Sequence, residues 1–219
     1  MIIPVYNEAE VIAGVVTATL LMFPNIVCVD DGSRDGSAEQ VLGTGAHLVS
    51  HPVNLGQGAA LQTGIEYALR QPGGKYFVTF DADGQHRPED AAALVDAVRT
   101  SAADVALGSR FLEAANEVPW IKRVLLKTVA ALSPAARRLQ LTDAHNGLRV
   151  LNRAAAESLN ITMNGMAHAS EIVAQLAKSE LTVTEVPVTV LYTEYSKAKG
   201  QSLINGVNIL FDLSLRSRR

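Results

Sequence analysis

The sequence predicts an α/β protein of one domain, in which a mostly parallel central sheet carries helices on both faces. Short apolar runs alternate with amphipathic segments of about 10–15 residues, which is the pattern of strands joined by helical crossovers. Polar, glycine-bearing stretches follow the apolar runs, and ligands of such sheets bind at the carboxyl ends of the strands. With 219 residues, 48% of them hydrophobic, the chain is long enough to bury one large core.

The first hundred residues contain alternating predicted strands and helices. Asn7 precedes the first helix and is a favoured N-cap residue. Pro88, with Glu89 and Asp90 in the first turn, favours a later helix start. The predicted strands are residues 2–5, 26–30, 46–50 and 76–80, and the predicted helices are residues 9–23, a segment ending near residue 43, a segment ending near residue 71, and residues 88–100.

The second half of the chain continues this alternation. Apolar residues from Trp120 to Val129 recur at helical spacing, and Pro134 interrupts the pattern. The other predicted elements are a strand at 104–107, a strand at 147–151, a helix at 167–179 and a strand at 181–192. We find no linker or internal repeat, so residues 1–202 are assigned to the one domain.

Residues 203–219 combine an apolar helical stripe with a basic end formed by Arg216, Arg218 and Arg219. The apolar part has about 13 residues, which is too short to span a bilayer. Two interpretations remain open. The segment either packs on the sheet as an ordinary helix, or it docks on a membrane surface or on a small membrane-protein partner.

Composition excludes several classes of protein. The net charge of −3 and the pI of about 5.9 give no general attraction to nucleic acid. Cys28 is the single cysteine and lies in an apolar run, which indicates a reducing compartment. No apolar run reaches the roughly 18 residues of a spanning helix, and the start lacks the features of a signal peptide. We therefore expect a cytoplasmic protein, soluble or peripheral on the membrane.

The stretch Asp81-Ala82-Asp83-Gly84-Gln85 follows a predicted buried strand. Side chains alternate along extended backbone, so the two carboxylates point the same way at the carboxyl edge, with Gln85 next on that side. Hard oxygen ligands in small number suit Mg²⁺ or Mn²⁺. The alternative is a solvated turn, because Asp and Gly also collect at strand ends for local reasons.

Six motifs together resemble glycosyltransferase family 2, and within it the polyprenyl-phosphate branch that includes dolichyl-phosphate mannosyltransferases. The resemblance covers about residues 2–202. It implies a GT-A fold, a nucleotide-diphosphate sugar donor such as GDP-mannose or a UDP-hexose, a polyprenyl phosphate acceptor and inversion at the anomeric carbon. The motifs are Pro4-Val5-Tyr6-Asn7-Glu8, Val29-Asp30-Asp31-Gly32-Ser33, Asn54-x-Gly56-x-Gly58, Asp81-Ala82-Asp83-Gly84-Gln85, Gly108-Ser109-Arg110 and Asp143-x-x-Asn146-Gly147-x-Arg149.

The resemblance also implies the residues of the donor site. Glu8 and Asp31 can accept hydrogen bonds from ribose or base, although helix capping and turn formation are the alternative roles. Gly56 and Gly58 either allow close approach of a ligand or only shape the start of a helix. The implied nucleotide-sugar residues are Pro4, Tyr6, Glu8, Val29, Asp31, Asp81, Ala82, Asp83 and Arg110, and the implied metal ligands are Asp81, Asp83 and Gln85.

The acceptor decides how much acid–base chemistry is needed. A sugar hydroxyl would need a general base, for which Asp143 is the first candidate and Glu171 the second. A phosphate acceptor needs none, because its second pKa is about 6. A nucleotide-binding domain without transfer activity is a third hypothesis. The resemblance implies Asp83, Arg110 and Asp143 as catalytic residues, and Arg149, Lys197, Lys199 and Ser202 as residues that bind the acceptor phosphate.

Overall fold

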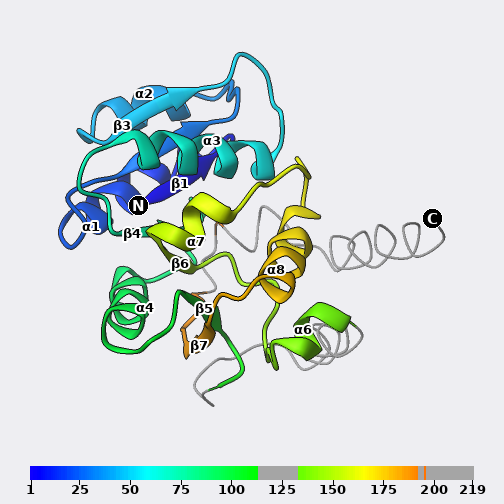
Figure 1. Cartoon of the computed structure of the whole chain (residues 1–219). Coiled ribbons are helices and arrows are strands. Elements are labelled where there is room, and N and C mark those ends of the chain that lie inside the picture. The colour runs from blue at the N-terminus through cyan, green and yellow to red at the C-terminus, as the bar shows by residue number, and fades with distance from the viewer. Residues whose placement is uncertain (113–132, 192–194, 196–219) are drawn as a thin grey trace.

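The computed structural model describes residues 1–112, 133–191 and 195 (Figure 1). Their centre is one seven-stranded sheet with the order β3-β2-β1-β4-β6-β5-β7. Within it, β6 runs antiparallel to both of its neighbours, and the other pairings are parallel. The strands are β1 (Ile2–Val5), β2 (Val27–Asp30), β3 (His47–Ser50), β4 (Tyr76–Thr79), β5 (Val105–Ser109), β6 (Arg149–Asn152) and β7 (Val183–Pro187).

Helices cover both faces of this sheet, as the sequence predicts. Successive side chains of β1 point to opposite faces, so Ile3 and Ile2 belong to different core clusters. The Ile3 face is covered by α1 (Ile12–Leu20), α2 (Ser37–Leu42) and α4 (Pro88–Thr100). The Ile2 face is covered by α3 (Gln57–Arg70), α7 (Arg153–Ser158) and α8 (His168–Lys178), and the short α6 (Pro134–Arg138) packs beside α8.

Two local predictions are wrong. Helix α1 begins at Ile12, and Asn7 does not cap it. Instead Asn7 has a φ of 54°, and its side-chain oxygen accepts a hydrogen bond of 3.0 Å from the Arg34 amide. The sequence analysis also missed α7, which follows β6 directly and is capped by the side chain of Asn152. It is only six residues long, too short to show a helical period.

Several predictions lie outside the described residues. These are the helix from Trp120 to Val129, the residues Lys197, Lys199 and Ser202, and the segment 203–219. Among the helices that the structure describes, none is long and apolar enough to cross a membrane.

Candidate active site

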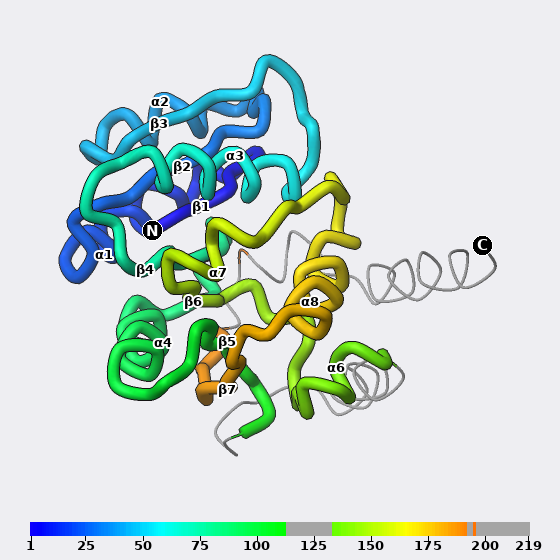
Figure 2. Tube along the Cα trace, viewed as in Figure 1, coloured from blue at the N-terminus to red at the C-terminus, as the bar shows by residue number. Residues whose placement is uncertain are grey.

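The predicted site residues that the structure describes lie at the carboxyl edge of the sheet, where β1, β2, β4 and β5 end. Figure 2 shows the course of the chain through these strands. The antiparallel β6 enters the sheet from this edge, so the loop before it also arrives there. Residues distant in sequence therefore meet: Asp81 follows β4, Arg110 follows β5 and Asp143 precedes β6. This placement agrees with the rule for ligand sites in parallel sheets.

Two side chains hold the Asp81 carboxylate, and a glycine leaves room for it. Its Oδ1 accepts a hydrogen bond of 3.1 Å from the Gln57 side chain, and its Oδ2 lies 2.9 Å from Nε2 of His86. A Cβ atom on Gly147 would overlap the Asp81 carboxylate, so glycine at this position leaves room for that side chain. Burial alone would raise the pKa of Asp81, but the hydrogen bond and charge of His86 and the charge of Arg149 outweigh it, and the pKa lies below its ordinary value.

Asp83 differs from Asp81 in having few donors. Its Oδ1 accepts a hydrogen bond of 3.0 Å from the Gln85 amide. Burial, the charge of Asp81 and, to a smaller extent, the charge of Glu8 raise the pKa of Asp83 to about 6. This crowding of negative charge is the environment that a divalent cation would stabilise.

The donor atoms fit such a cation only in part. Asp81 and Asp83 supply hard carboxylate oxygens, and Mg²⁺ commonly binds one or two carboxylates while keeping several waters. Gln85 is buried beside them. Within the described residues, no three His, Cys, Asp or Glu side chains form a metal-binding group. A cation at this edge would therefore depend on substrate or water for its other ligands.

Asp31 is buried and holds the loop in front of α3. Its carboxylate accepts hydrogen bonds from the amides of Leu55, at 2.9 Å, and Gly56, at 2.7 Å, and it lies 2.8 Å from Nδ1 of His51. Gly58 in turn donates its amide to Asn164 at 2.7 Å. A Cβ on either glycine would overlap the backbone of residues 163 and 164. The two glycines therefore let this loop approach the start of α3, and Gly56 also has a φ of 101° at the N-cap position.

The other predicted nucleotide residues surround the loop after β1. Pro4 and Val29 are buried partners in the register of β1 and β2, and Ala82 is also buried. Tyr6 is exposed. The hydroxyl of Tyr195 donates a hydrogen bond of 2.7 Å to the Glu8 carboxylate, so Tyr195 lies against this loop.

Arg110 and Asp143 form a bidentate ion pair. Arg110 Nε lies 2.6 Å from Oδ2, and Nη2 lies 2.7 Å from Oδ1. Both side chains are nearly buried, with 11% and 2% of their surface exposed. Burial would raise the pKa of Asp143, but the adjacent guanidinium outweighs burial and holds the pKa below its ordinary value.

Arg149 lies on β6 behind this pair. Only 3% of the residue is exposed, and Nη1 is buried without a hydrogen-bond partner among the described residues. Burial lowers the pKa of Arg149, while the charges of Asp81 and Asp143 favour its charged form. A buried guanidinium nitrogen without a partner is costly, so an additional acceptor such as water or an anion would stabilise it.

Sequence reasoning missed the residues that hold the carboxylates. His86 directly follows the predicted metal motif, and Gln57 lies between Gly56 and Gly58 of the glycine motif. Both positions were therefore next to predicted motifs, but their contacts with Asp81 could not be read from the sequence. Glu171, the second candidate for a general base, instead accepts hydrogen bonds from the amides of Thr162 and Met163 at the loop before α8.

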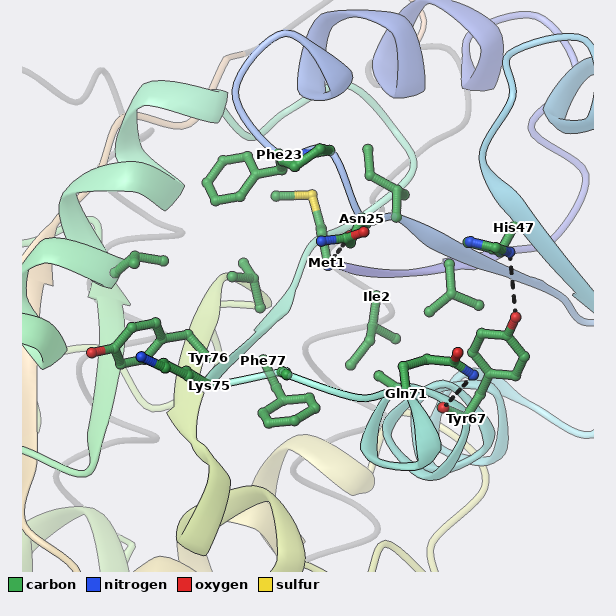
Figure 3. A pocket seen from close by; sticks show the side chains of 18 of the residues that line it. Met1, Ile2, Phe23, Asn25, His47, Tyr67, Gln71, Lys75, Tyr76 and Phe77 are labelled. Atoms are coloured by element: carbon green, nitrogen blue, oxygen red, sulfur yellow. Dashed lines mark hydrogen bonds between the residues drawn. The ribbon is translucent and has the colours of Figure 1, made fainter.

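A cavity of about 550 Å³ lies at the opposite end of the strands (Figure 3). Met1, Ile2, Tyr76 and Phe77 line it, and a hydrogen bond of 3.3 Å between Tyr67 and His47 closes one side. None of the predicted site residues that the structure describes lines this cavity. We therefore place the candidate active site at the carboxyl edge and not in this cavity.

Residues 1–159 match the family described as Glycosyl transferase family 2. The chain is 32% identical to the polyprenol monophosphomannose synthase of Mycolicibacterium smegmatis, over 95% of this chain and 82% of that protein. It is 29% identical to the UDP-N-acetylglucosamine--dolichyl-phosphate N-acetylglucosaminyltransferase of Methanococcus voltae, over 97% of this chain and 93% of that protein.

The fold is also similar to that of a solved enzyme. The glucosyl-3-phosphoglycerate synthase from Mycobacterium tuberculosis, solved in complex with Mn²⁺ and uridine-diphosphate-glucose, matches with a TM-score of 0.72. The match covers 93% of this chain and 72% of that chain at 17% sequence identity, so it shows the fold alone. The predicted α/β fold of the GT-A type is confirmed.

Proposed function

The chain belongs to glycosyl transferase family 2, and on that premise we propose that it transfers a sugar from a nucleotide-diphosphate sugar to the phosphate of a polyprenyl phosphate. Two relatives support this acceptor class, since one is named a polyprenol monophosphomannose synthase and the other a dolichyl-phosphate N-acetylglucosaminyltransferase. The proposed donor is GDP-mannose or a UDP-hexose. We further propose that the enzyme works at the cytoplasmic face of the membrane, with residues 203–219 as the docking segment.

The state of Asp143 is the observation that carries the choice of acceptor. A hydroxyl acceptor needs a general base with a pKa near the working pH. Asp143 is instead bound on both oxygens by Arg110, and its pKa is lowered. A phosphate acceptor is mostly dianionic at neutral pH and needs no base. The Arg110–Asp143 pair therefore favours a phosphate acceptor over a sugar hydroxyl.

The proposed reaction is one direct displacement. An oxygen of the acceptor phosphate attacks the anomeric carbon while the bond from that carbon to the diphosphate oxygen breaks. The nucleoside diphosphate leaves, and a glycosyl phosphodiester forms with the anomeric configuration inverted. Since there is no proton to remove from the acceptor, the protein has to position two anions and balance their charge.

The donor half of the site would bind the nucleotide diphosphate. Glu8 offers acceptor oxygens for ribose or base, and Asp31 fixes the loop beside it. Asp81 and Asp83, with Gln85, would hold Mg²⁺ or Mn²⁺. A bound divalent cation offsets the negative charge that develops on the leaving diphosphate.

The acceptor half would bind the lipid phosphate. Arg110 lies at the end of β5 with Asp143 holding its guanidinium. Arg149 lies behind the pair, and one of its nitrogens is buried with no partner in the part of the chain that the structure describes. Guanidinium groups bind phosphate oxygens well, often through two parallel hydrogen bonds. Lys197, Lys199 and Ser202 remain the predicted further contacts to this phosphate.

A donor and metal screen tests the proposal. Purified protein is incubated with GDP-mannose, UDP-glucose or UDP-N-acetylglucosamine, with Mg²⁺ or Mn²⁺, and with a short-chain polyprenyl phosphate. We expect a lipid-linked sugar with one donor and its loss in excess chelator. Transfer that continues undiminished in chelator would contradict the metal role of Asp81 and Asp83, and no product with any donor would contradict the proposed function.

A further inference from the structure

Glu185 lies in the middle of β7, where its carboxylate faces the loop that carries Asp143. It is opposite Leu107 of β5 in the sheet register. Residues 139–148 form turns and bends with no regular helix or strand, so the loop has no hydrogen-bond ladder of its own to fix Asp143 relative to β5. Among the described residues, backbone hydrogen bonds fix only the two ends of the loop, at Leu141 and Leu148, so the residues between them depend on side chains that reach them.

The Glu185 carboxylate binds this loop at three donors. Oε1 accepts hydrogen bonds of 2.9 Å from the amides of both Thr142 and Asp143. Oε2 accepts a hydrogen bond of 2.8 Å from the Thr142 amide and one of 2.9 Å from its hydroxyl. Hydrogen bonds to a charged acceptor are the strong ones, so one side chain holds both residues.

The same contact extends to β5 through two hydroxyl groups. Thr142 gives its hydroxyl proton to Glu185, so the Ser109 hydroxyl, 2.6 Å away, must donate to Thr142. Ser109 Oγ in turn accepts a hydrogen bond of 3.2 Å from the Phe111 amide. Glu185 therefore orders the residues on both sides of Arg110 as well as the residue that pairs with it.

A role in packing alone explains the glutamate at position 185 less well than a role in positioning this loop. β7 lies at one edge of the described sheet, and Glu185 lies between Val183 and Pro187 on a face that contacts core residues. An apolar side chain would serve packing without the cost of removing a charge from water. The charge is compensated instead by donors from the two residues that lead into the Arg110–Asp143 pair.

We propose that Glu185 is a positioning residue of the acceptor site. By fixing the backbone of Thr142 and Asp143, it places the Asp143 carboxylate against Nε and Nη2 of Arg110. This contact sets the direction of the guanidinium that would bind the acceptor phosphate. This inference rests on the proposed function, and it assigns a role in sugar transfer to a residue that does not touch the substrate.

The first test is Glu185→Gln, which keeps the size of the side chain but replaces one acceptor oxygen by an amide group that cannot accept from N–H. The matched control is Glu180→Gln, at an exposed position shortly before β7. With a short-chain polyprenyl phosphate as acceptor, we expect kcat/KM for the acceptor to fall about tenfold or more in Glu185→Gln. The dissociation constant of the nucleotide sugar should stay within about twofold, and Glu180→Gln should change neither value.

A double-mutant cycle separates positioning from general damage. If Glu185 acts through Asp143, the variant that combines Glu185→Gln with Asp143→Asn should lose no more acceptor kcat/KM than the worse single variant, within about twofold. Losses that multiply, or an equal loss of donor affinity in Glu185→Gln, would overturn the inference. If Glu185→Gln does not fold, Thr142→Val removes only the hydroxyl link, and it should lower the same parameter by a smaller factor without changing donor affinity.

A measurement that needs no substrate distinguishes failure of this inference from failure of the proposed function. If the wild-type protein transfers no sugar to polyprenyl phosphate, the proposed function is wrong. The Nε–H proton of Arg110 still reports on the ion pair by NMR. We expect Glu185→Gln to accelerate its exchange with solvent about tenfold or more, with no change in Glu180→Gln. Unchanged exchange in Glu185→Gln would contradict the positioning role.

Discussion

In the first half of the sheet, formed by β3, β2, β1 and β4, the buried Asp31 carboxylate accepts hydrogen bonds from backbone amides and contacts His51. In the second half, formed by β6, β5 and β7, the buried Asp143 carboxylate is paired with Arg110. Backbone amides carry no net charge, so they leave the charge of a carboxylate uncompensated, whereas a guanidinium offsets it. Asp81, Asp83 and Glu8 add to the negative charge of the first half, which suits a cation. Arg110 and Arg149 make the second half suitable for an anion.

Asp83→Asn should cause the largest loss of sugar transfer. It removes one negative charge from the half that would hold the cation, and we expect kcat for sugar transfer to fall about 10³-fold or more. The fold should survive, because Asp83 accepts a single described hydrogen bond, from Gln85. The matched control is Asp96→Asn, which alters an exposed pair with Arg99 on α4 and should leave kcat unchanged. Full activity in Asp83→Asn would remove the basis for a cation-binding half.

Gly147→Ala should follow, with a loss of kcat of about 10²-fold. The added Cβ overlaps the Asp81 carboxylate, so Asp81 has to leave Gln57 or His86. This variant tests whether the loop of the second half positions a carboxylate of the first. Gly14→Ala is the control. Among the described residues outside its own helix turn, no atom lies within 4 Å of an added Cβ, and the change should raise the free energy of unfolding by about 0.5–1 kcal/mol without changing kcat.

Asp31→Asn should affect stability more than chemistry. An amide cannot accept from the N–H groups of both Leu55 and Gly56 as the carboxylate does, and a buried donor left without a partner costs about 1–3 kcal/mol. Urea unfolding should show this loss, together with weaker binding of the nucleotide sugar. Glu66→Gln, at an exposed pair with Arg70, serves as the control. If Asp31→Asn has wild-type stability, the amide contacts do not hold this loop.

The smallest predicted effect is a pH dependence in the second half. Burial lowers the pKa of His145 to about 4, so the folded protein binds its proton less readily than the unfolded chain, whose histidine pKa is about 6.5. The contribution of neutral His145 to the free energy of unfolding is therefore fully present above about pH 6.5 and is lost as the pH falls towards about 4. His145→Gln should make the free energy of unfolding flatter across this range. Identical slopes in His145→Gln and the wild type would contradict it.

The sheet could be predicted because its signals are local. The apolar runs that end at Val5, Asp30 and Thr79, and the proline at the start of α4, depend only on neighbouring residues. The positions of the site motifs followed from the rule that parallel strands present their carboxyl ends together. What could not be predicted is how the polar side chains pair. Arg110 and Asp143 are 33 residues apart, and their pairing depends on an antiparallel β6 that alternation of strands and helices does not reveal.

The chemical identity of the acceptor group tests the proposed transfer to a polyprenyl phosphate most directly. Wild-type protein and Asp143→Asn are each given the active nucleotide sugar, the metal ion, and either a short-chain polyprenyl phosphate or the matched polyprenol, and the products are analysed by mass spectrometry and NMR. We expect a glycosyl phosphodiester with inverted anomeric configuration, no product from the polyprenol, and a loss of kcat in Asp143→Asn well below the roughly 10²–10⁴-fold that general-base catalysis contributes. Sugar attached to the hydroxyl of the polyprenol, or a loss of that full size in Asp143→Asn with donor affinity unchanged, would contradict it.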